Sequence, residues 1–338
     1  MAAAKRVYDT RSLASEFFGA ASEQQVIFTP SCTFSLNTAI KSILGSGGHA
    51  VISDMEHNAV MRPLEKLKSS GVSYTKAAVV PGDNDKTVDN FRRSIRSDTK
   101  ALICTHASNV FGIRLPVERL CALAHAYGLL FVLDAAQSAG IAGVNMDHGY
   151  DIVCIAPHKG LYSPMGTGLM ILSEGISPDT LIEGGTGSNS LSPSQPEELP
   201  DKFESGTLNF PGISGMYEGI RFVMSRGEER IRKHEMQLIQ RLYRELKKDP
   251  GIILYTDEPD ESSFVPVLSF NIRDAHSEQT ARLLDRNGIA VRAGLHCAPC
   301  AHEAMGTLET GTVRISPSAF TTERDIERVI YVLRHGKI

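Results

Sequence analysis

Residues 129–140 read LLFVLDAAQSAG, an apolar run that ends at Asp134 and then turns through small residues. A short, continuously apolar run of this kind predicts a strand buried on both faces, as in a parallel sheet. The preceding residues 118–128, ERLCALAHAYG, place apolar side chains at helical spacing and end at Gly128, a typical C-terminal cap. A helix that leads into a buried strand is the repeating unit of an α/β fold.

The same alternation extends in both directions, from about residue 25 to residue 173. It predicts an α/β fold with a mainly parallel sheet whose two faces are covered by helices. The other strand-like runs are QVIFT (25–29), HAVIS (49–53), ALICT (101–105), DIVCIA (151–156) and GTGLMILS (166–173).

The second half of the chain has a different pattern. Residues 184–201, GGTGSNSLSPSQPEELPD, predict a loop that is too long to be a mere connection. Two helical stretches over residues 212–248 then precede three strand-like runs and a last helix from Thr322. The chain of 338 residues exceeds the usual size of one compact core. We therefore predict a large domain over residues 1–215 and a smaller α+β domain over residues 216–338.

Composition and charge argue against several classes of protein. The net charge of −4 gives no general attraction to nucleic acid, and no apolar run approaches the ~20 residues that span a bilayer. The opening MAAAKRVYDT lacks the apolar core of a signal peptide. The six cysteines are sparse, so no disulfide framework is indicated. We expect a cytoplasmic protein that binds neither membrane nor nucleic acid.

Two polar side chains at predicted strand ends suggest chemistry. Lys159, in APHKG, is followed by small and apolar residues rather than by acidic partners, which favours a reactive amine. Asp134 ends a buried strand, where open α/β sheets form ligand sites. Taken singly, Lys159 is more often a loop lysine, and Asp134 a helix N-cap with Gln137 in its capping box. Together they suit pyridoxal 5'-phosphate (PLP), whose aldehyde a lysine holds and whose ring nitrogen a carboxylate keeps protonated.

The order of a strand followed by DAAQSAG and a strand followed by APHKGLYSPMGTG resembles the class V aminotransferase family, specifically its cysteine desulfurase group. The resemblance covers essentially the whole chain. It implies a fold-type I PLP-dependent transferase with a seven-stranded type of sheet in the large domain. It also implies that Asp134 pairs with the ring nitrogen and Gln137 contacts the phenolic oxygen. His158 would then be a phosphate ligand, and Lys159 would form the Schiff base.

Three further segments extend this resemblance. SDMEHNAV implies that His57 stacks on the cofactor ring, although a histidine after a strand is by itself more often structural. THASNVFG places Asn109 near the phenolic oxygen and the substrate, where the plain alternative is a turn residue. TPSCTFSLN predicts a strand, a small-residue turn and a helix N-terminus, which suits a phosphate. The resemblance assigns the phosphate to Thr33 and to the backbone amide of Cys32.

The resemblance also concerns assembly, and it has two departures. Thr207, in FESGTLN, matches a threonine that reaches the phosphate of the neighbouring subunit, which implies a homodimer. Ala156 stands where relatives usually place Ser or Thr, and the missing hydroxyl should remove one phosphate hydrogen bond, a net loss of roughly 1 kcal/mol or somewhat more. The chain starts at a stretch that resembles the helix after the family's usual opening segment. We expect a few dozen residues of the family pattern to be absent.

The segment VRAGLHCAPCAH resembles the loop that carries the sulfur-accepting cysteine of the desulfurases, at Cys297. The resemblance implies that the Cys297 thiolate takes sulfur from L-cysteine as a persulfide, leaves alanine, and can serve a sulfur-acceptor protein. It further implies that Arg314 binds the substrate carboxylate through its planar fork, with Arg292 in support. By itself, Arg314 reads as a surface strand arginine.

Several alternatives remain open. His296, Cys297, Cys300 and His302 form a compact cluster of soft ligands that can hold zinc or cycle as a dithiol. Adjacent residues rarely point to one ion, so we predict no metal, whereas a resolving role for Cys300 stays a minor hypothesis. Selenocysteine lyase, β-eliminating lyase and aminotransferase activities use the same type of cofactor site. The non-enzymatic alternative is a truncated, weakly active homologue that acts as a sulfur-transfer partner.

Overall fold

A seven-stranded sheet forms the centre of the fold. The computed structural model describes residues 2–336. The strands lie in the order β1-β7-β6-β5-β4-β2-β3, and β7 alone runs antiparallel to its neighbours. They are β1 (Val26–Thr29), β2 (Gly48–Ser53), β3 (Val72–Ala77), β4 (Thr99–Thr105), β5 (Leu130–Asp134), β6 (Ile152–Ile155) and β7 (Gly168–Leu172).

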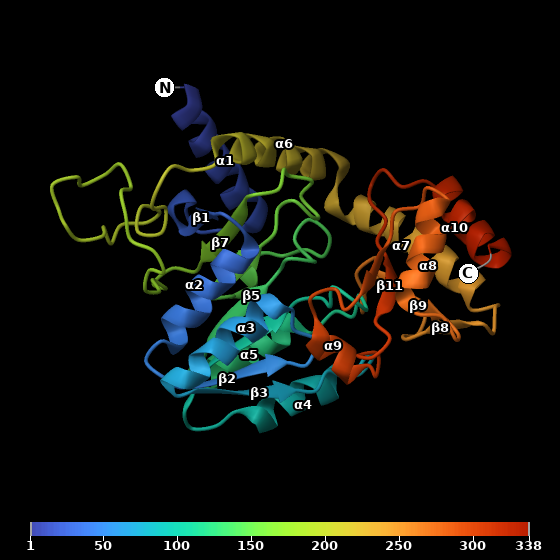
Figure 1. Cartoon of the computed structure of the whole chain (residues 1–338). Coiled ribbons are helices and arrows are strands. Elements are labelled where there is room, and N and C mark those ends of the chain that lie inside the picture. Colours follow the sequence, from blue (N-terminus) through green and yellow to red (C-terminus); the bar gives the residue numbers. More distant parts are fainter. Residues whose placement is uncertain (1, 337–338) are drawn as a thin grey trace.

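Helices cover this sheet on both faces (Figure 1). Phe131 and Leu133 of β5 pack in one apolar core and Val132 in another, because successive side chains of a strand point to opposite faces. This two-sided burial explains the continuous apolar run and confirms the predicted α/β class. The helices of this part are α1 (Ala2–Phe18), α2 (Cys32–Leu44), α3 (Asn58–Leu67), α4 (Asn84–Ser94) and α5 (Val117–Ala126), with 3₁₀ turns η1 (Glu23–Gln25), η2 (Lys68–Ser70) and η3 (Met146–His148).

A second, four-stranded antiparallel sheet lies toward the C-terminus, in the order β10-β11-β9-β8. Helix α6 continues through residue 215 without a break and lies against α1. The predicted domain boundary at residue 215 falls within this helix, and it stays a prediction. The elements of this part are α6 (Phe210–Arg226), α7 (Glu228–Leu246), β8 (Ile252–Leu254), β9 (Leu268–Ile272), α8 (Ser277–Arg286), β10 (Arg292–Gly294), α9 (Pro299–Ala304), β11 (Thr312–Ile315) and α10 (Glu323–His335).

Local predictions from the sequence fare unequally. Gly128 follows α5 with a φ of +68°, the left-handed backbone of a helix end, as predicted. Residues 184–201 contain no helix or strand and extend as a wide loop away from the sheet (Figure 1). The sequence patterns miss β3, an edge strand of mixed polarity, and α9, which is a helix of 6 residues within the predicted loop around Cys297.

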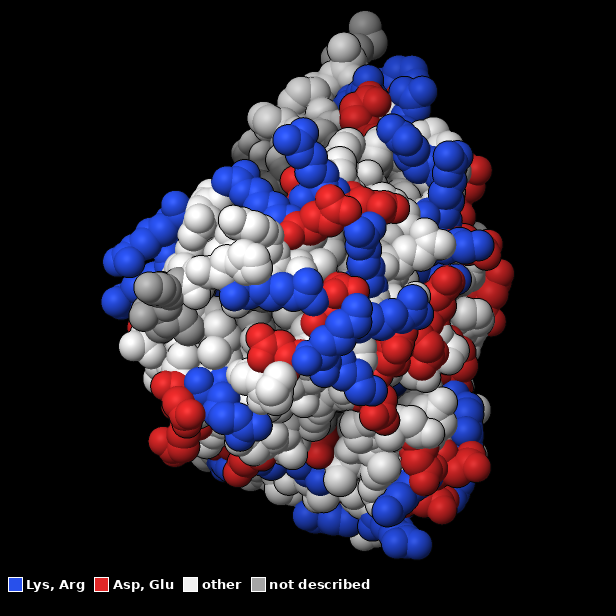
Figure 2. Space-filling view, turned by 90° about the vertical axis from the view of Figure 1, so that its right-hand side faces the viewer, with Lys and Arg blue, Asp and Glu red and all other residues white. Residues whose placement is uncertain are grey.

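Charges of both signs interleave over the face of the C-terminal part (Figure 2). Helices α7 and α10 are joined there by ion pairs of Arg241 with Glu323 and Glu327, and of Arg334 with Glu245. That face therefore offers no extended patch of one sign. Within residues 2–336, no helix is both long and apolar enough to cross a membrane.

A buried ion pair fixes α1 to the sheet. Arg11 donates from Nη1 to Glu204 Oε1 at 2.8 Å and from Nη2 to Glu204 Oε2 at 2.7 Å, and the two side chains are 9% and 6% exposed. Glu204 Oε1 also accepts a hydrogen bond from the backbone N–H of Phe28 at 2.7 Å. The pair thus joins α1, β1 and the end of the long loop.

Removing the cation should destabilise the fold. We expect Arg11→Met to lower the free energy of unfolding by about 3–5 kcal/mol, because the Glu204 carboxylate is left buried and unpaired. Urea unfolding measures the loss. Lys5 of the same helix pairs with Asp9 at the surface, so Lys5→Met should change stability by less than about 1 kcal/mol. An equal loss in both variants would contradict this account of the pair.

Candidate active site

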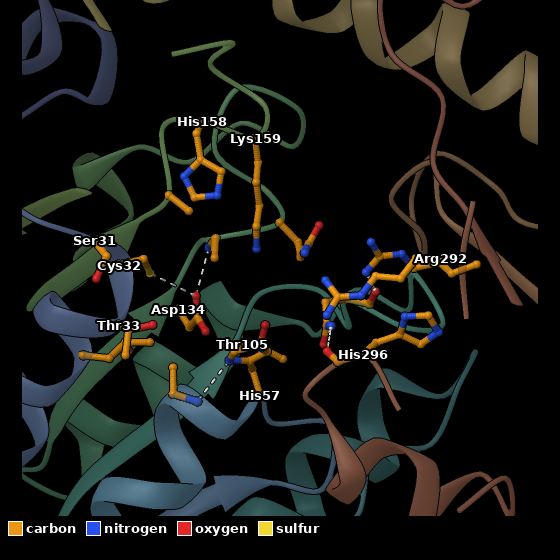
Figure 3. Close-up of a pocket in the computed structure, with 17 residues that line it drawn as sticks. Ser31, Cys32, Thr33, His57, Thr105, Asp134, His158, Lys159, Arg292 and His296 are labelled. Carbon is orange, nitrogen blue, oxygen red and sulfur yellow. Dashed lines mark hydrogen bonds between the residues drawn. The ribbon is translucent and has the colours of Figure 1, made fainter. Parts of the chain in front are cut away.

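The carboxyl ends of β4, β5 and β6 meet the N-terminus of α2 around a cavity of about 250 Å³. Such a junction is where open α/β sheets bind ligands. Strands β10 and β11 of the C-terminal sheet close its other side (Figure 3). The lining residues are Ser31, Cys32, Thr33, Leu36, His57, Ala59, Thr105, Asn109, Asp134, Ala136, Gln137, Ala156, His158, Lys159, Arg292, His296 and Arg314.

Lys159 projects into the middle of this cavity (Figure 3). It lies in a tight turn after β6, in which its N–H donates to the Ala156 carbonyl at 3.1 Å. Part of its side chain is exposed, because it faces an open cavity. The surrounding protein nevertheless withdraws the amine from bulk water, and this desolvation lowers the pKa of Lys159. A lowered pKa increases the fraction of Lys159 that is present as the uncharged, nucleophilic amine.

Asp134 is the carboxylate of the cavity. It ends β5, is 3% exposed, and its Oδ1 accepts a hydrogen bond from the N–H of Ala136 at 2.9 Å. The thiol of Cys32 lies 3.7 Å from the same oxygen. Burial, followed by the charge of Asp134, raises the pKa of Cys32 well above its usual range, so Cys32 is a protonated donor and not a nucleophile.

The first turn of α2 forms another wall. Ser31 caps the helix by accepting a hydrogen bond from the N–H of Phe34 at 3.2 Å, and Thr33 lines the cavity beside it. Gly168 of β7 passes directly under this turn, where an added Cβ would lie 2.4 Å from the Ser31 carbonyl carbon and 2.7 Å from the Cys32 nitrogen. Only glycine lets the strand approach so closely. The helix N-terminus is thereby held against the cavity, where its partial positive charge favours an anion.

His57 is the aromatic side chain next to this turn. It caps α3, and its Nδ1 accepts a hydrogen bond from the N–H of Ala59 at 3.0 Å. Burial lowers the pKa of His57, so the ring is neutral and carries its hydrogen on Nε2. A neutral ring can lie against a flat ligand without adding charge.

Two arginines lie side by side on the wall of the cavity that the C-terminal sheet forms. Arg292 of β10 and Arg314 of β11 are directly paired in the antiparallel register, an arrangement that is unfavourable for like charges. Neither forms an ion pair with a carboxylate of residues 2–336. Such a pair of cations, both lining the cavity, suits an anionic ligand such as a carboxylate.

Asn109 links these arginines to the rest of the site. Its backbone carbonyl accepts a hydrogen bond from Arg314 Nη1 at 2.8 Å, and its Nδ2 donates to the His296 carbonyl at 2.8 Å. Its Oδ1 is buried and has no protein partner within the described chain. A buried amide oxygen without a donor indicates room for a ligand that supplies one. The predicted residues Gln137 and His158 also line the cavity.

Cys297 lies outside the cavity, in an adjoining groove that shares Thr33, His57 and Ala59 with it. Its thiol is exposed, and Arg292 Nη2 lies 3.8 Å from its sulfur. His296 and Cys297 both adopt left-handed backbone, with φ of +49° and +58°, which is costly for residues other than glycine. Sequence analysis predicted a cysteine loop here, but not its strained backbone.

The geometry of the residues around Cys297 bears on the zinc and dithiol alternatives. The rings of His296 and His302 stack, with centroids 5.8 Å apart, instead of converging on a point. Throughout the described chain, no three His, Cys, Asp or Glu side chains form a group that could hold a metal ion. Cys300 is buried, and desolvation raises its pKa to about 11, whereas Cys297 is exposed. The two thiols therefore differ in reactivity.

Thr207 does not reach the cavity of its own chain. It is exposed and follows the long loop, so its predicted contact with the phosphate of a neighbouring subunit stays a prediction.

Sequence analysis missed the contact between the half-buried Tyr162 and the buried Glu235, close to Lys159. The hydroxyl of Tyr162 donates to Glu235 Oε1 at 3.0 Å and accepts from the N–H of Ala319 at 2.9 Å. The hydroxyl thus joins the turn of Lys159, helix α7 and the segment after Arg314. The signal was weak, because Glu235 sits one turn from other polar residues on an amphipathic helix.

Comparison of the sequence with known proteins shows the family to which a chain with this fold and this cavity belongs. The family model described as Aminotransferase class-V matches residues 1–329. A probable cysteine desulfurase from Methanothermobacter thermautotrophicus is 31% identical over 338 residues, which cover 96% of this chain and 82% of that protein. The chain belongs to the class V aminotransferase family.

Solved structures show the same fold. A cysteine desulfurase from Thermococcus onnurineus superposes with a TM-score of 0.90 at 28% identity, covering 98% of this chain and 83% of that one. A cysteine desulfurase from Escherichia coli gives a TM-score of 0.89 at 23% identity, covering 98% of this chain and 84% of the other. The predicted fold-type I architecture is confirmed.

The side chains present fit PLP, the cofactor of this family. The group combines an aldehyde, a ring nitrogen that takes a proton, and a phosphate. The cavity offers an amine at Lys159, a carboxylate at Asp134 and a helix N-terminus at Cys32, together with the partnerless oxygen of Asn109. Each part of the cofactor therefore has a matching group on the protein.

Glu235 should make stability depend on pH. Burial raises the pKa of Glu235 from its ordinary 4.5 to about 7, so the folded protein binds this proton more tightly than the unfolded chain does. Its contribution is fully present below pH 4.5 and is lost as the pH rises through about 7. Glu235→Gln imitates the protonated acid. We expect it to match the wild type at pH 4.5 and to be more stable at pH 8, by at most about 3 kcal/mol.

Urea unfolding at the two pH values measures this difference. Glu218, which is 59% exposed, supplies the control, because Glu218→Gln should shift both values little and equally. An offset for Glu235→Gln that does not change with pH would contradict the titration of this carboxyl.

Proposed function

We propose that the chain is a PLP-dependent cysteine desulfurase, which converts L-cysteine to L-alanine and carries the sulfur as a persulfide on Cys297. The observation that carries this proposal is the juxtaposition of a desolvated lysine, a buried carboxylate and two arginines in one cavity, with an exposed cysteine at its edge. Neither arginine has a carboxylate partner within residues 2–336. The names of the related proteins support it.

Residues at the ends of β4, β5 and β6 and at the starts of α2 and α3 would hold the cofactor. Lys159 would bind the aldehyde carbon, Asp134 would keep the proton on the ring nitrogen, and His57 would pack against the ring. The first turn of α2, with Thr33 and the amide of Cys32, binds the phosphate beside His158. Gln137 and Asn109, which line the same cavity, would contact the phenolic oxygen. When bound, PLP supplies an electrophilic carbon for the substrate amine and an electron sink for the α-carbon.

The arginines would position the substrate. Arg314 binds the carboxylate of L-cysteine through its guanidinium fork, and Arg292 adds a second positive charge. Arg314 Nε is buried and has no protein partner in residues 2–336, so it retains a donor for this purpose. Arg292 is paired directly with Arg314 in the register of β10 and β11, which supports a substrate-binding role for Arg292 as well.

Lysine and cysteine would then perform separate steps. Once the substrate amine has taken its place, Lys159 Nζ is uncharged and moves the proton at the substrate α-carbon. The Cys297 thiolate forms a bond to the substrate sulfur while the bond between that sulfur and Cβ breaks. The electron pair of the broken bond stays with the carbon skeleton, which takes up a proton and leaves as alanine. The strained backbone at Cys297 suits a loop that must bring its sulfur from the groove into the cavity.

The assembly and compartment are part of the same proposal. A homodimer would bring Thr207 of one subunit to the phosphate held by the other, which fits the exposure of Thr207. A cytoplasmic location would keep Cys297 reduced, as the persulfide step requires. A sulfur-acceptor protein would then receive the sulfur.

Replacing Cys297 tests the persulfide step. We expect Cys297→Ser to reduce cysteine-dependent alanine formation by at least about 100-fold, because a hydroxyl is a far weaker nucleophile than a thiolate. The visible absorbance of the bound cofactor should remain, since Cys297 lies outside the cavity. Alanine is measured after incubation with L-cysteine and dithiothreitol.

Cys300→Ser is the matched control, three residues away and buried. It should keep alanine formation within about twofold, because its thiol has a raised pKa and stays protonated. Intact turnover in Cys297→Ser would reject the persulfide on Cys297. A matching loss in Cys300→Ser would instead favour the dithiol alternative.

A further inference from the structure

The groove that holds Cys297 is strongly basic. It lies between α2 and α3, has a volume of about 390 Å³, and is lined by Lys41, Arg62 and Lys66 but by no carboxylate. Arg62 and Lys66 stand four residues apart on α3, so they lie on one face of the helix. Lys41 faces them from the last turn of α2. Arg292, next to Cys297, adds a further cation at the end of the groove.

These cations lack the partners that neighbouring basic residues have. Lys68 pairs with Glu65 at 2.8 Å and Lys76 with Glu303 at 2.7 Å. Lys41, Arg62 and Lys66 form no ion pair with any residue of the described part of the chain. The positive charge of the groove is therefore uncompensated, and it favours an anionic occupant.

The groove also leads to the atom that would carry sulfur. The carbonyl of Cys297 accepts a hydrogen bond from the N–H of Asn58 at 2.8 Å, which places the cysteine beside the start of α3. The thiol is exposed in the groove, whereas the cofactor cavity lies behind Thr33 and His57. A molecule that takes sulfur from Cys297 therefore meets these cations.

We propose that this groove binds an acidic segment of a sulfur-accepting protein and presents its thiol to Cys297. The inference rests on the proposed function. Lys41 of α2 stands across the groove from Arg62 and Lys66 of α3, so the three positive charges are spread over two helices. The spread of charge over two helices fits a peptide segment better than a single small anion.

The transfer itself needs no oxidant. The acceptor thiolate forms a bond to the outer sulfur of the Cys297 persulfide, and the bond between that sulfur and Cys297 Sγ breaks. Its electron pair stays on Sγ, which becomes a thiolate again. The proton released by the acceptor thiol goes to water or to the regenerated Cys297. The cations hold the acidic acceptor close to Cys297.

Matched acceptor peptides test the proposal on the full-length holoenzyme. One peptide has the sequence Glu-Glu-Cys-Glu-Glu, the other Lys-Lys-Cys-Lys-Lys, and dithiothreitol is the uncharged acceptor. With L-cysteine in excess, we expect a KM for the acidic peptide about tenfold or more below that for the basic one at low salt. This advantage should shrink as sodium chloride is added, because the contacts are exposed.

Charge reversal assigns the effect to the groove. The triple variant K41E/R62E/K66E should reverse the preference between the peptides and keep turnover with dithiothreitol within about twofold, since none of its side chains lines the cofactor cavity. The control K86E/R93E/K233E changes the net charge equally at exposed residues outside the groove. It should keep the wild-type preference.

The other outcomes overturn the inference. Equal KM values for the two peptides, or an equal shift in the control variant, would show that the groove does not select the acceptor. If light scattering shows that the groove variant loses an oligomeric state while its peptide preference is unchanged, the occupant is a second copy of this chain. Wild-type protein that forms no alanine even with dithiothreitol would overturn the proposed function as well.

Discussion

The removal of one lysine amine from bulk water is the constraint on which the site depends. A tight turn after β6 brings Lys159 into its cavity, which the carboxylate of Asp134 also lines. Desolvation lowers the pKa of the amine, while the carboxylate limits the cost of the remaining charge. The parallel strands place both groups at the same edge of the sheet. The reversed strand β7 lets Gly168 press the start of α2 against the same cavity.

Positive charge is distributed unevenly around this centre. Arg292 and Arg314 face the cavity in direct register, and Lys41, Arg62 and Lys66 continue the positive charge along the adjoining groove. Cys297 lies between the two sets, with Arg292 near its sulfur. An anionic substrate on one side and an anionic acceptor on the other would each neutralise cations that have no carboxylate partner within residues 2–336. The proposed order of steps at Cys297, in which substrate binds on the cavity side and acceptor on the groove side, fits this placement of positive charge.

Much of the fold could be predicted from the sequence, because buried strands such as β5 and β6 have apolar runs that end at, or just before, the cavity residues Asp134 and Lys159. The cavity residues Asp134, His57 and Lys159 were predicted because strand ends and the family resemblance pointed to the same positions. The edge strand β3 was missed because only one of its faces needs apolar residues. The contact of Tyr162 with Glu235 joins residues 73 positions apart, and no local pattern reports such a pair. The left-handed backbone at His296 and Cys297 could not be predicted, because neither residue type usually adopts it.

The proposed function requires that Lys159 hold the cofactor covalently. Borohydride reduction of the protein supplied with PLP, followed by digestion and mass spectrometry, tests it most directly. The account predicts that the visible absorbance disappears on reduction and that the added mass of the reduced cofactor lies on Lys159. No absorbance before reduction, or a modification on another lysine, would contradict the claim.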